Sequence, residues 1–156
     1  MRHGVPREYV LLEGLLRSNK LKLIAIAGHL GSGKTTFARR LERELNLQRL
    51  TLDDFLDKKY HGPNIRNVND EMDRLANFGL PVVIEGVGVL ITLETLSYKY
   101  DFLVYMERQR RPGAKEFTDE FYAESTITEP ATNLIRIYDD QERARQLADL
   151  IVTRPF

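Results

Sequence analysis

Eight residues near the start of the chain have the types and spacing of a phosphate-binding site. Residues 28–35 read Gly-His-Leu-Gly-Ser-Gly-Lys-Thr and fit the pattern G-x-x-x-x-G-K-[ST]. The glycines let successive backbone N–H groups converge on a polyphosphate and keep side chains away from it. Lys34 supplies a compact cation for the β- and γ-phosphates, and the Thr35 hydroxyl is a candidate magnesium ligand. The pattern therefore predicts a nucleotide-phosphate site.

The segments on either side of this loop are those that such a site requires. The mostly apolar run at residues 21–27 predicts a buried strand before it, and Phe37, Leu41 and Leu45 predict a helix with one apolar face after it. The positive end of that helix would face the bound phosphates. A glycine-rich turn that only joins strand to helix is the alternative, but it has no need of Lys-Thr at these positions. The predicted phosphate-binding residues are Gly28, His29, Leu30, Gly31, Ser32, Gly33, Lys34, Thr35 and Thr36.

Acidic residues follow two further predicted strands. Asp53 and Asp54 come after a short strand, where a carboxylate can accept or orient the proton of an attacking hydroxyl. Glu85 ends an apolar strand, where it can help to hold the metal or to position an acceptor. Thr35, Asp53 and Glu85 are therefore the candidate magnesium ligands. As structural alternatives, the aspartates could cap a helix or form a turn, and Glu85 could be a partly exposed strand-end acid.

Three arginines follow the strand that is predicted at residues 101–106. Arg108, Arg110 and Arg111 precede a Pro-Gly pair and open the least regular part of the sequence. An arginine on a mobile segment could close over the transferring phosphate, neutralise its charge and exclude water. We expect a lid over about residues 108–132, with Arg108 as the candidate catalytic residue, although the sequence does not say which arginine acts. A solvated basic cluster is the alternative.

Other polar residues have simpler structural explanations. His29 occupies a variable position of the loop and is expected to face solvent, whereas His61 could contact an acceptor. Asp139, Asp140 and Glu142 are expected to form the acidic amino-terminal end of a helix, which the helix dipole favours.

The order of the predicted elements indicates an α/β fold. Strands are expected at residues 21–27, 48–52, 81–87, 101–106 and 148–153, helices at 6–17, 36–45, 70–78, 91–98 and 138–147, and a polar surface loop at 57–69. Alternating strands and helices predict a parallel sheet covered on both faces, whose ligands bind beyond the carboxyl ends of the strands. That edge would carry the phosphate loop, Asp53 and Asp54, Glu85 and Gly86, and Glu107 and Arg108.

Composition excludes several classes of protein. The chain has 156 residues, which fits one domain with a single well-buried core. Its 23 basic and 23 acidic residues cancel, so no electrostatic footprint for nucleic acid or an anionic membrane is expected. The absence of cysteine excludes disulfides and thiolate metal sites. The first residues lack a signal-peptide apolar region and no segment approaches a membrane span, which predicts a cytoplasmic location.

These motifs together resemble the uridine kinase and nicotinamide riboside kinase group of phosphate-loop kinases, over about residues 21–153. Leu-Asp-Asp-Phe at residues 52–55 is similar to the segment whose first aspartate acts as base on the acceptor hydroxyl, which favours Asp53 over Asp54. The other similar segments are the third strand with its Glu-Gly end at residues 81–86, the strand leading into the arginine-bearing lid at 101–108, and the last strand at 148–152.

The resemblance implies one three-layer phosphate-loop domain over residues 1–156, with five parallel strands in the order 2-3-1-4-5. It implies transfer of the γ-phosphoryl group of ATP, with Mg²⁺, to a hydroxyl of a nucleoside-like or other small metabolite. Lys34, Asp53, Glu85 and Arg108 would be catalytic. Two alternatives remain open: a different acceptor, such as a nucleotide, a sugar acid or an antibiotic, or a nucleotide-hydrolysing switch or binding module. The preference for ATP over GTP and the oligomeric state are left open.

Overall fold

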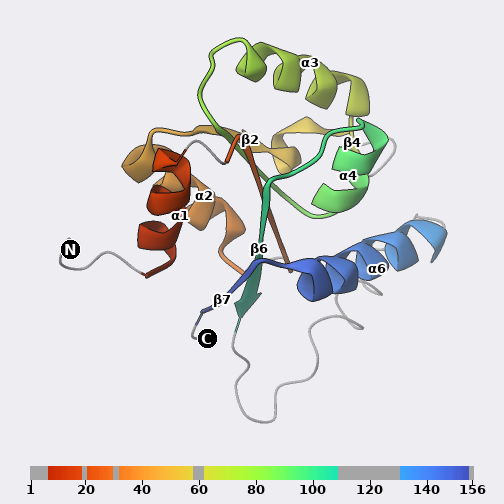
Figure 1. The fold of residues 1–156 in the computed structure, drawn as a ribbon. Coiled ribbons are helices and arrows are strands. Elements are labelled where there is room, and N and C mark those ends of the chain that lie inside the picture. Colours follow the sequence, from red (N-terminus) through yellow and green to blue (C-terminus); the bar gives the residue numbers. More distant parts are fainter. Residues whose placement is uncertain (1–6, 19–20, 30–31, 58–61, 109–130, 155–156) are drawn as a thin grey trace.

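The computed structural model contains a central sheet of five parallel strands (Figure 1). The structure describes residues 7–18, 21–29, 32–57, 62–108 and 131–154. The strands of this sheet are β1 (Leu23–Gly28), β2 (Gln48–Thr51), β5 (Val82–Glu85), β6 (Phe102–Arg108) and β7 (Leu150–Arg154). Their spatial order is β2-β5-β1-β6-β7. Counted along the chain this is the order 2-3-1-4-5, so the predicted fold class and strand order are confirmed.

Strand register brings the ends of four strands to one edge of the sheet. Ile26 of β1 lies beside Glu85 of β5, and Glu85 in turn lies beside Thr51 of β2. On the other side of β1, Gly28 lies beside Met106 of β6. Because all these pairs are parallel, whatever follows each strand emerges at the same carboxyl edge.

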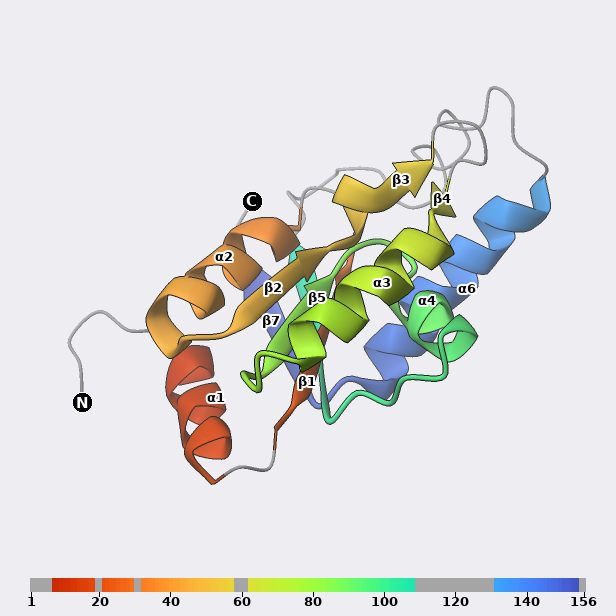
Figure 2. The same ribbon diagram turned by 90° about the horizontal axis from the view of Figure 1, so that it is seen from above.

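Helices cover both faces of the sheet (Figure 2). On one face lie α1 (Arg7–Arg17) and α2 (Lys34–Leu45), and on the other lie α3 (Ile65–Ala76), α4 (Val89–Thr95) and α6 (Ala131–Leu147). All six residues of β1 are buried, with Ile24 and Ile26 facing the α1 and α2 side and Ala25 and Ala27 facing the other. An apolar run without polar alternation is what a central strand between two helix layers requires.

The segment after β2 contains more regular secondary structure than the sequence suggested. We expected a surface loop over residues 57–69, but β3 (Leu56–Asp57) pairs antiparallel with β4 (Gly62–Pro63), and α3 begins at Ile65. Asn64 caps this helix, because its side chain accepts a hydrogen bond from the backbone N–H of Asn67 at 3.2 Å. The helix buries Val68, Met72 and Leu75 against the sheet. A 3₁₀ turn (Leu52–Phe55) separates β2 from β3.

The last helix is also longer than predicted. α6 begins at Ala131 rather than at residue 138, so Asp139, Asp140 and Glu142 lie within it and not at its amino-terminal end. Their assignment as a helix-terminal acidic cluster is therefore wrong. Asp140 is instead buried, at 3 % exposure.

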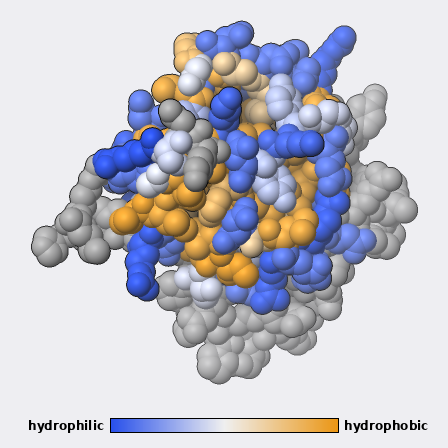
Figure 3. Space-filling model, in the orientation of Figure 1, coloured by the Kyte–Doolittle hydropathy of each residue, from blue (hydrophilic) through white to orange (hydrophobic). Residues whose placement is uncertain are grey.

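Apolar side chains gather near the centre of the face shown in Figure 3, and hydrophilic ones surround them. Among the residues whose exposure the structure describes, the large apolar ones that are exposed are Val10 and Leu11 on α1, Phe78 and Leu80 after α3, Leu147 at the end of α6 and Ile151 in β7. They come from separate parts of the fold, a distribution that is ordinary for a folded protein. Within the described ranges, no helix has the length and apolar character needed to cross a membrane.

Candidate nucleotide site

Glycines let the backbone adopt positive φ angles at the end of β1 and at the start of α2. Gly28 has φ +152°, and a Cβ there would lie 2.5 Å from the carbonyl oxygen of Met106 and 2.8 Å from Oγ of Ser32. Gly33 has φ +91° and forms the amino-terminal cap of α2. Ser32 between them is buried, and its N–H donates to the carbonyl of His29 at 3.1 Å. Leu30 and Gly31 lie outside the described residues.

Lys34, the first residue of α2, is held beneath this loop. Its side chain is buried, and Nζ donates to the carbonyl oxygen of His29 at 2.8 Å. Burial lowers the pKa of Lys34, while the negative charges of Glu85 and Asp53 oppose that shift. The cation is therefore largely desolvated, and it lies in the electric field of a strand-end glutamate and of an aspartate.

Thr35 and Glu85 form a direct contact at the sheet edge. The Thr35 hydroxyl donates to Oε1 of Glu85 at 2.8 Å. Glu85 is 0 % exposed, and its Oε2 has no hydrogen-bond partner in the part of the chain that the structure describes. A buried carboxylate oxygen left without a partner calls for an explanation, and a cation is one. Hydroxyl and carboxylate oxygens are donors that Mg²⁺ prefers, so this pair fits the metal that the sequence implied.

Among the residues that the structure describes, no group of three or more His, Cys, Asp or Glu side chains could hold a metal ion.

Asp53 and Asp54 lie in the 3₁₀ turn that follows β2, and both are exposed. Gly86 allows this turn to approach the end of β5, because a Cβ at Gly86 would lie 2.6 Å from Cβ of Leu52. Of the two aspartates, Asp53 contributes to the field that acts on Lys34. The turn thus brings an exposed carboxylate to the same edge as the loop and Glu85.

The expectation for His29 is wrong, whereas several other residues singled out from the sequence lie outside the described part of the chain. His29 does not face solvent: it is half-buried, and its ring stands edge-on to that of Tyr105, with centroids 6.2 Å apart. Glu107 forms an ion pair with Arg145 of α6 at 2.9 Å. The backbone of Arg108 ends β6, and its side chain lies outside the description, as do His61, Arg110 and Arg111.

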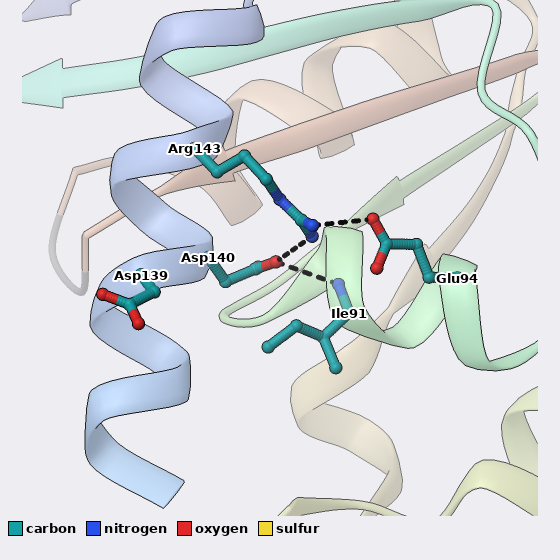
Figure 4. A pocket seen from close by; sticks show the side chains of 5 residues that line it. All are labelled: Ile91, Glu94, Asp139, Asp140 and Arg143. Carbon is teal, nitrogen blue, oxygen red and sulfur yellow. Dashed lines mark hydrogen bonds and ion pairs between the residues drawn. The ribbon is translucent and has the colours of Figure 1, made fainter. Parts of the chain in front are cut away.

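Sequence reasoning missed a polar cluster between α4 and α6 (Figure 4). Ile91 and Glu94 of α4, with Asp139, Asp140 and Arg143 of α6, line a pocket of about 260 Å³. Figure 4 shows Arg143 reaching toward Glu94, and Asp140 pointing at the backbone of Ile91, whereas Asp139 points away from both. No local signal marks this cluster, because its two halves are joined only by the fold.

Comparison with known proteins supports the architecture. A family model described as "AAA domain" matches residues 23–87, which run from β1 through the end of β5. No curated protein matches the chain at a significant level. A structure described as a possible uridine kinase from Bacillus stearothermophilus is similar at 15 % identity and a TM-score of 0.55, covering 92 % of this chain and 96 % of that one.

A second similar structure comes from Silicibacter sp. TM1040 and is described as a candidate fructose transport system kinase. It is 13 % identical with a TM-score of 0.53, covering 95 % of this chain and 100 % of that one. At such identities the similarity shows the fold, which is that of the phosphate-loop kinases.

Proposed function

We propose that the protein is a phosphate-loop kinase that transfers the γ-phosphoryl group of ATP, with Mg²⁺, to a hydroxyl of a small metabolite. The observation that carries this proposal is the meeting of four groups at one sheet edge. Lys34 is buried beneath the glycine-rich loop, Thr35 is hydrogen-bonded to the buried Glu85, and Asp53 acts electrostatically on the same lysine. Phosphoryl transfer depends mainly on such positioning and on charge stabilisation.

Each group has a role that follows from its chemistry. The N–H groups of the loop and of the start of α2 bind phosphate oxygens, and Lys34 exchanges the His29 carbonyl for a phosphate. Thr35 and Glu85 hold the metal, with Asp53 as a further candidate ligand. Bound magnesium would neutralise charge on the β- and γ-phosphates. Asp53 orients the acceptor hydroxyl and accepts its proton. Arg108 or a neighbouring arginine stabilises the transferred charge.

The acceptor that we favour is nucleoside-like. Support comes from Leu-Asp-Asp-Phe at residues 52–55 and from the fold shared with a structure described as a possible uridine kinase. The second structure reported above, described as a candidate fructose transport system kinase, favours a sugar as the next class to test. Nucleotides, sugar acids and antibiotics are further acceptor classes.

The experiment is a screen for ADP release from Mg-ATP in the presence of nucleosides, vitamins, sugars, sugar acids and antibiotics. A kinase releases ADP only when its acceptor is present, and the phosphorylated product is then identified by mass. The Lys34→Ala variant is the control for contaminating activity. Steady ADP release that no acceptor changes would replace the proposal with a nucleotide-hydrolysing switch, which is the alternative from another class.

A further inference from the structure

A buried carboxylate on α6 holds the start of α4 (Figure 4). Oδ1 of Asp140 accepts a hydrogen bond from the backbone N–H of Ile91 at 3.0 Å. Gly88 is the cap residue of α4, with φ +74° and no side-chain hydrogen bond. The first N–H groups of a helix need acceptors from outside it. Asp140 supplies one from another helix, 49 residues away in the sequence.

Arg143 holds Asp140 in place and extends the contact to a second residue of α4. Its Nη2 lies 3.1 Å from Oδ1 of Asp140, and its Nη1 lies 2.9 Å from Oε1 of Glu94. The Asp140 side chain is 2 % exposed, so hydrogen-bond and ion-pair partners must replace the water that its carboxylate has lost. Asp140, Arg143 and Glu94 are called the α4–α6 clamp below.

The clamp lies close in the chain to the candidate metal ligand. Only residues 86–88 separate Glu85, at the end of β5, from Val89, the first residue of α4. This short turn is hydrogen-bonded at both ends. The N–H of Gly86 donates to the carbonyl of Ile26 at 3.4 Å, and the carbonyl of Gly88 accepts from the Thr92 hydroxyl at 2.9 Å. A displacement of the first turn of α4 therefore reaches Glu85 through three residues.

We propose that Asp140 is a positioning residue for the nucleotide–metal site, because it fixes the first turn of α4 and thereby the orientation of the Glu85 carboxylate. This inference rests on the proposed function, in which Glu85 holds magnesium. Asp140 does not itself bind nucleotide or metal in this arrangement, and it acts through Glu85. Residues that orient metal ligands in other proteins cost about 10- to 100-fold in metal affinity or activity when they are replaced.

The test measures ATP affinity twice, with excess Mg²⁺ and with EDTA, for the wild type, Asp140→Ala and Asp140→Asn. The ratio of the two affinities reports on the metal site and needs no knowledge of the acceptor. Asp140→Ala should lower this ratio about tenfold and leave the affinity in EDTA unchanged. Asp140→Asn keeps an oxygen that can accept from Ile91 and loses the ion pair with Arg143, so its loss should be smaller. This near-isosteric variant decides the matter if the alanine variant does not fold.

Asp149 provides a matched control for loss of stability. Its Oδ2 accepts from the backbone N–H of Leu103 at 2.8 Å, near the start of β6 and at the opposite edge of the sheet. Asp149→Ala therefore removes the same kind of bond far from the site and should leave the magnesium ratio unchanged. Asp139→Ala, at the exposed neighbouring position on α6, should do the same.

A second readout follows the structural link without any nucleotide. Hydrogen exchange of the amides of residues 86–91 should become faster in Asp140→Ala and stay unchanged in Asp149→Ala. The inference would be overturned if Asp140→Ala and Asp149→Ala had the same ratio of ATP affinities with and without Mg²⁺. It would also be overturned if hydrogen exchange over residues 86–91 were unchanged in Asp140→Ala. Either result would leave the proposed function standing. A wild type that binds no nucleotide, or binds it without any effect of magnesium, would instead overturn the proposed function and the positioning role with it.

Discussion

Thr35 and Glu85 lie 50 residues apart in the chain, and the hydroxyl of the first donates to the carboxylate of the second over 2.8 Å. This bond ties the start of α2 to the end of β5, so the phosphate loop and the acidic strand end form one unit. Oε2 of Glu85 is buried and has no hydrogen-bond partner among the described residues, so the unit holds an acceptor oxygen that is not yet satisfied. A divalent cation with its phosphate ligands would complete it.

Lys34→Ala should abolish the stabilisation that nucleotide gives to the fold. At about one hundred times its dissociation constant, Mg-ATP should raise the free energy of unfolding of the wild type by about 2.7 kcal/mol. For a domain of this size that corresponds to a rise of roughly 5–10 °C in melting temperature. Lys22→Ala is the matched control, since Lys22 is exposed and precedes the opposite end of β1. A wild type whose melting temperature does not respond to millimolar nucleotide of any kind contradicts the phosphate site.

Glu85→Gln should weaken the magnesium dependence of ATP binding. The amide oxygen can still accept from Thr35, so the variant keeps the shape of the contact and loses the charge that would attract the metal. We expect an affinity for Mg²⁺, measured by titration at saturating ATP, that is lower by about 10- to 100-fold. Glu107→Gln is the control at the same sheet edge, because that carboxylate is paired with Arg145. An unchanged magnesium titration in Glu85→Gln would exclude Glu85 as a ligand.

Replacement of the arginines of the predicted lid should affect turnover more than nucleotide affinity. An arginine that contacts the charge of the transferring group acts mainly in the transition state. Arg108→Ala, Arg110→Ala or Arg111→Ala should therefore lower kcat and leave the affinity for ATP nearly unchanged. The measurement is steady-state transfer to the acceptor found in the screen, alongside nucleotide titration. Arg39→Ala, at an exposed position on α2, is the control. Unchanged kinetics in all three variants would leave a solvated surface cluster.

The sheet and its edge could be predicted because local patterns specify them. Apolar runs such as residues 21–27 identify buried strands, and parallel strands bring their carboxyl ends together. The early start of α3 was missed because residues 64–69 are polar in composition. The spacing of Val68, Met72 and Leu75, together with Asn64 as a cap, was the signal that could have identified it.

The environment of Asp140 could not be predicted in this way. Its position beside Asp139 resembles a helix-terminal acidic pair, and both residues look alike in the sequence. Only the packing of α6 against α4 buries Asp140 and leaves Asp139 exposed. In the same way, the edge-on contact of His29 with Tyr105 joins residues on neighbouring strand ends, which local periodicity does not reveal.

Asp140 should also give the folded state a measurable pH dependence. Burial raises its pKa above the ordinary value of 3.8, while Arg143 and the N–H of Ile91 oppose the shift. At pH values between 3.8 and the raised pKa of Asp140, the folded state binds more protons at this site than the unfolded state does. The contribution of Asp140 to stability is therefore fully present below 3.8 and is lost as the pH rises through its folded pKa.

The measurement for Asp140 is urea unfolding of the wild type and Asp140→Asn across the acidic range. The wild type should lose stability relative to the variant as the pH rises through this window, and the difference should then stay constant. Asp139→Asn, one residue away and exposed, should follow the wild type. A difference between the wild type and Asp140→Asn that does not vary with pH contradicts the prediction.

Asp53→Asn should keep ATP binding and lose phosphoryl transfer. The substitution preserves the size of the side chain and removes the charge that would orient the acceptor hydroxyl and take its proton, so the deficit belongs to the chemical step. General-base contributions amount to about a hundredfold to ten-thousandfold, or roughly 3–5 kcal/mol of barrier. Because Asp53 also opposes the lowered pKa of Lys34, its loss leaves that lysine with Glu85 as its principal counter-charge. We therefore expect a change in nucleotide affinity that is small beside the change in transfer.

Asp54→Asn is the matched control, since Asp54 lies in the same 3₁₀ turn as Asp53 and is also exposed. Its effect on transfer should be milder. The measurement is single-turnover transfer to the identified acceptor, with nucleotide titration of each variant. Transfer near the wild-type rate in Asp53→Asn would remove Asp53 as the base. A severe loss in Asp54→Asn alone would assign the base to the second member of the pair, which would require the turn after β2 to present Asp54 to the acceptor.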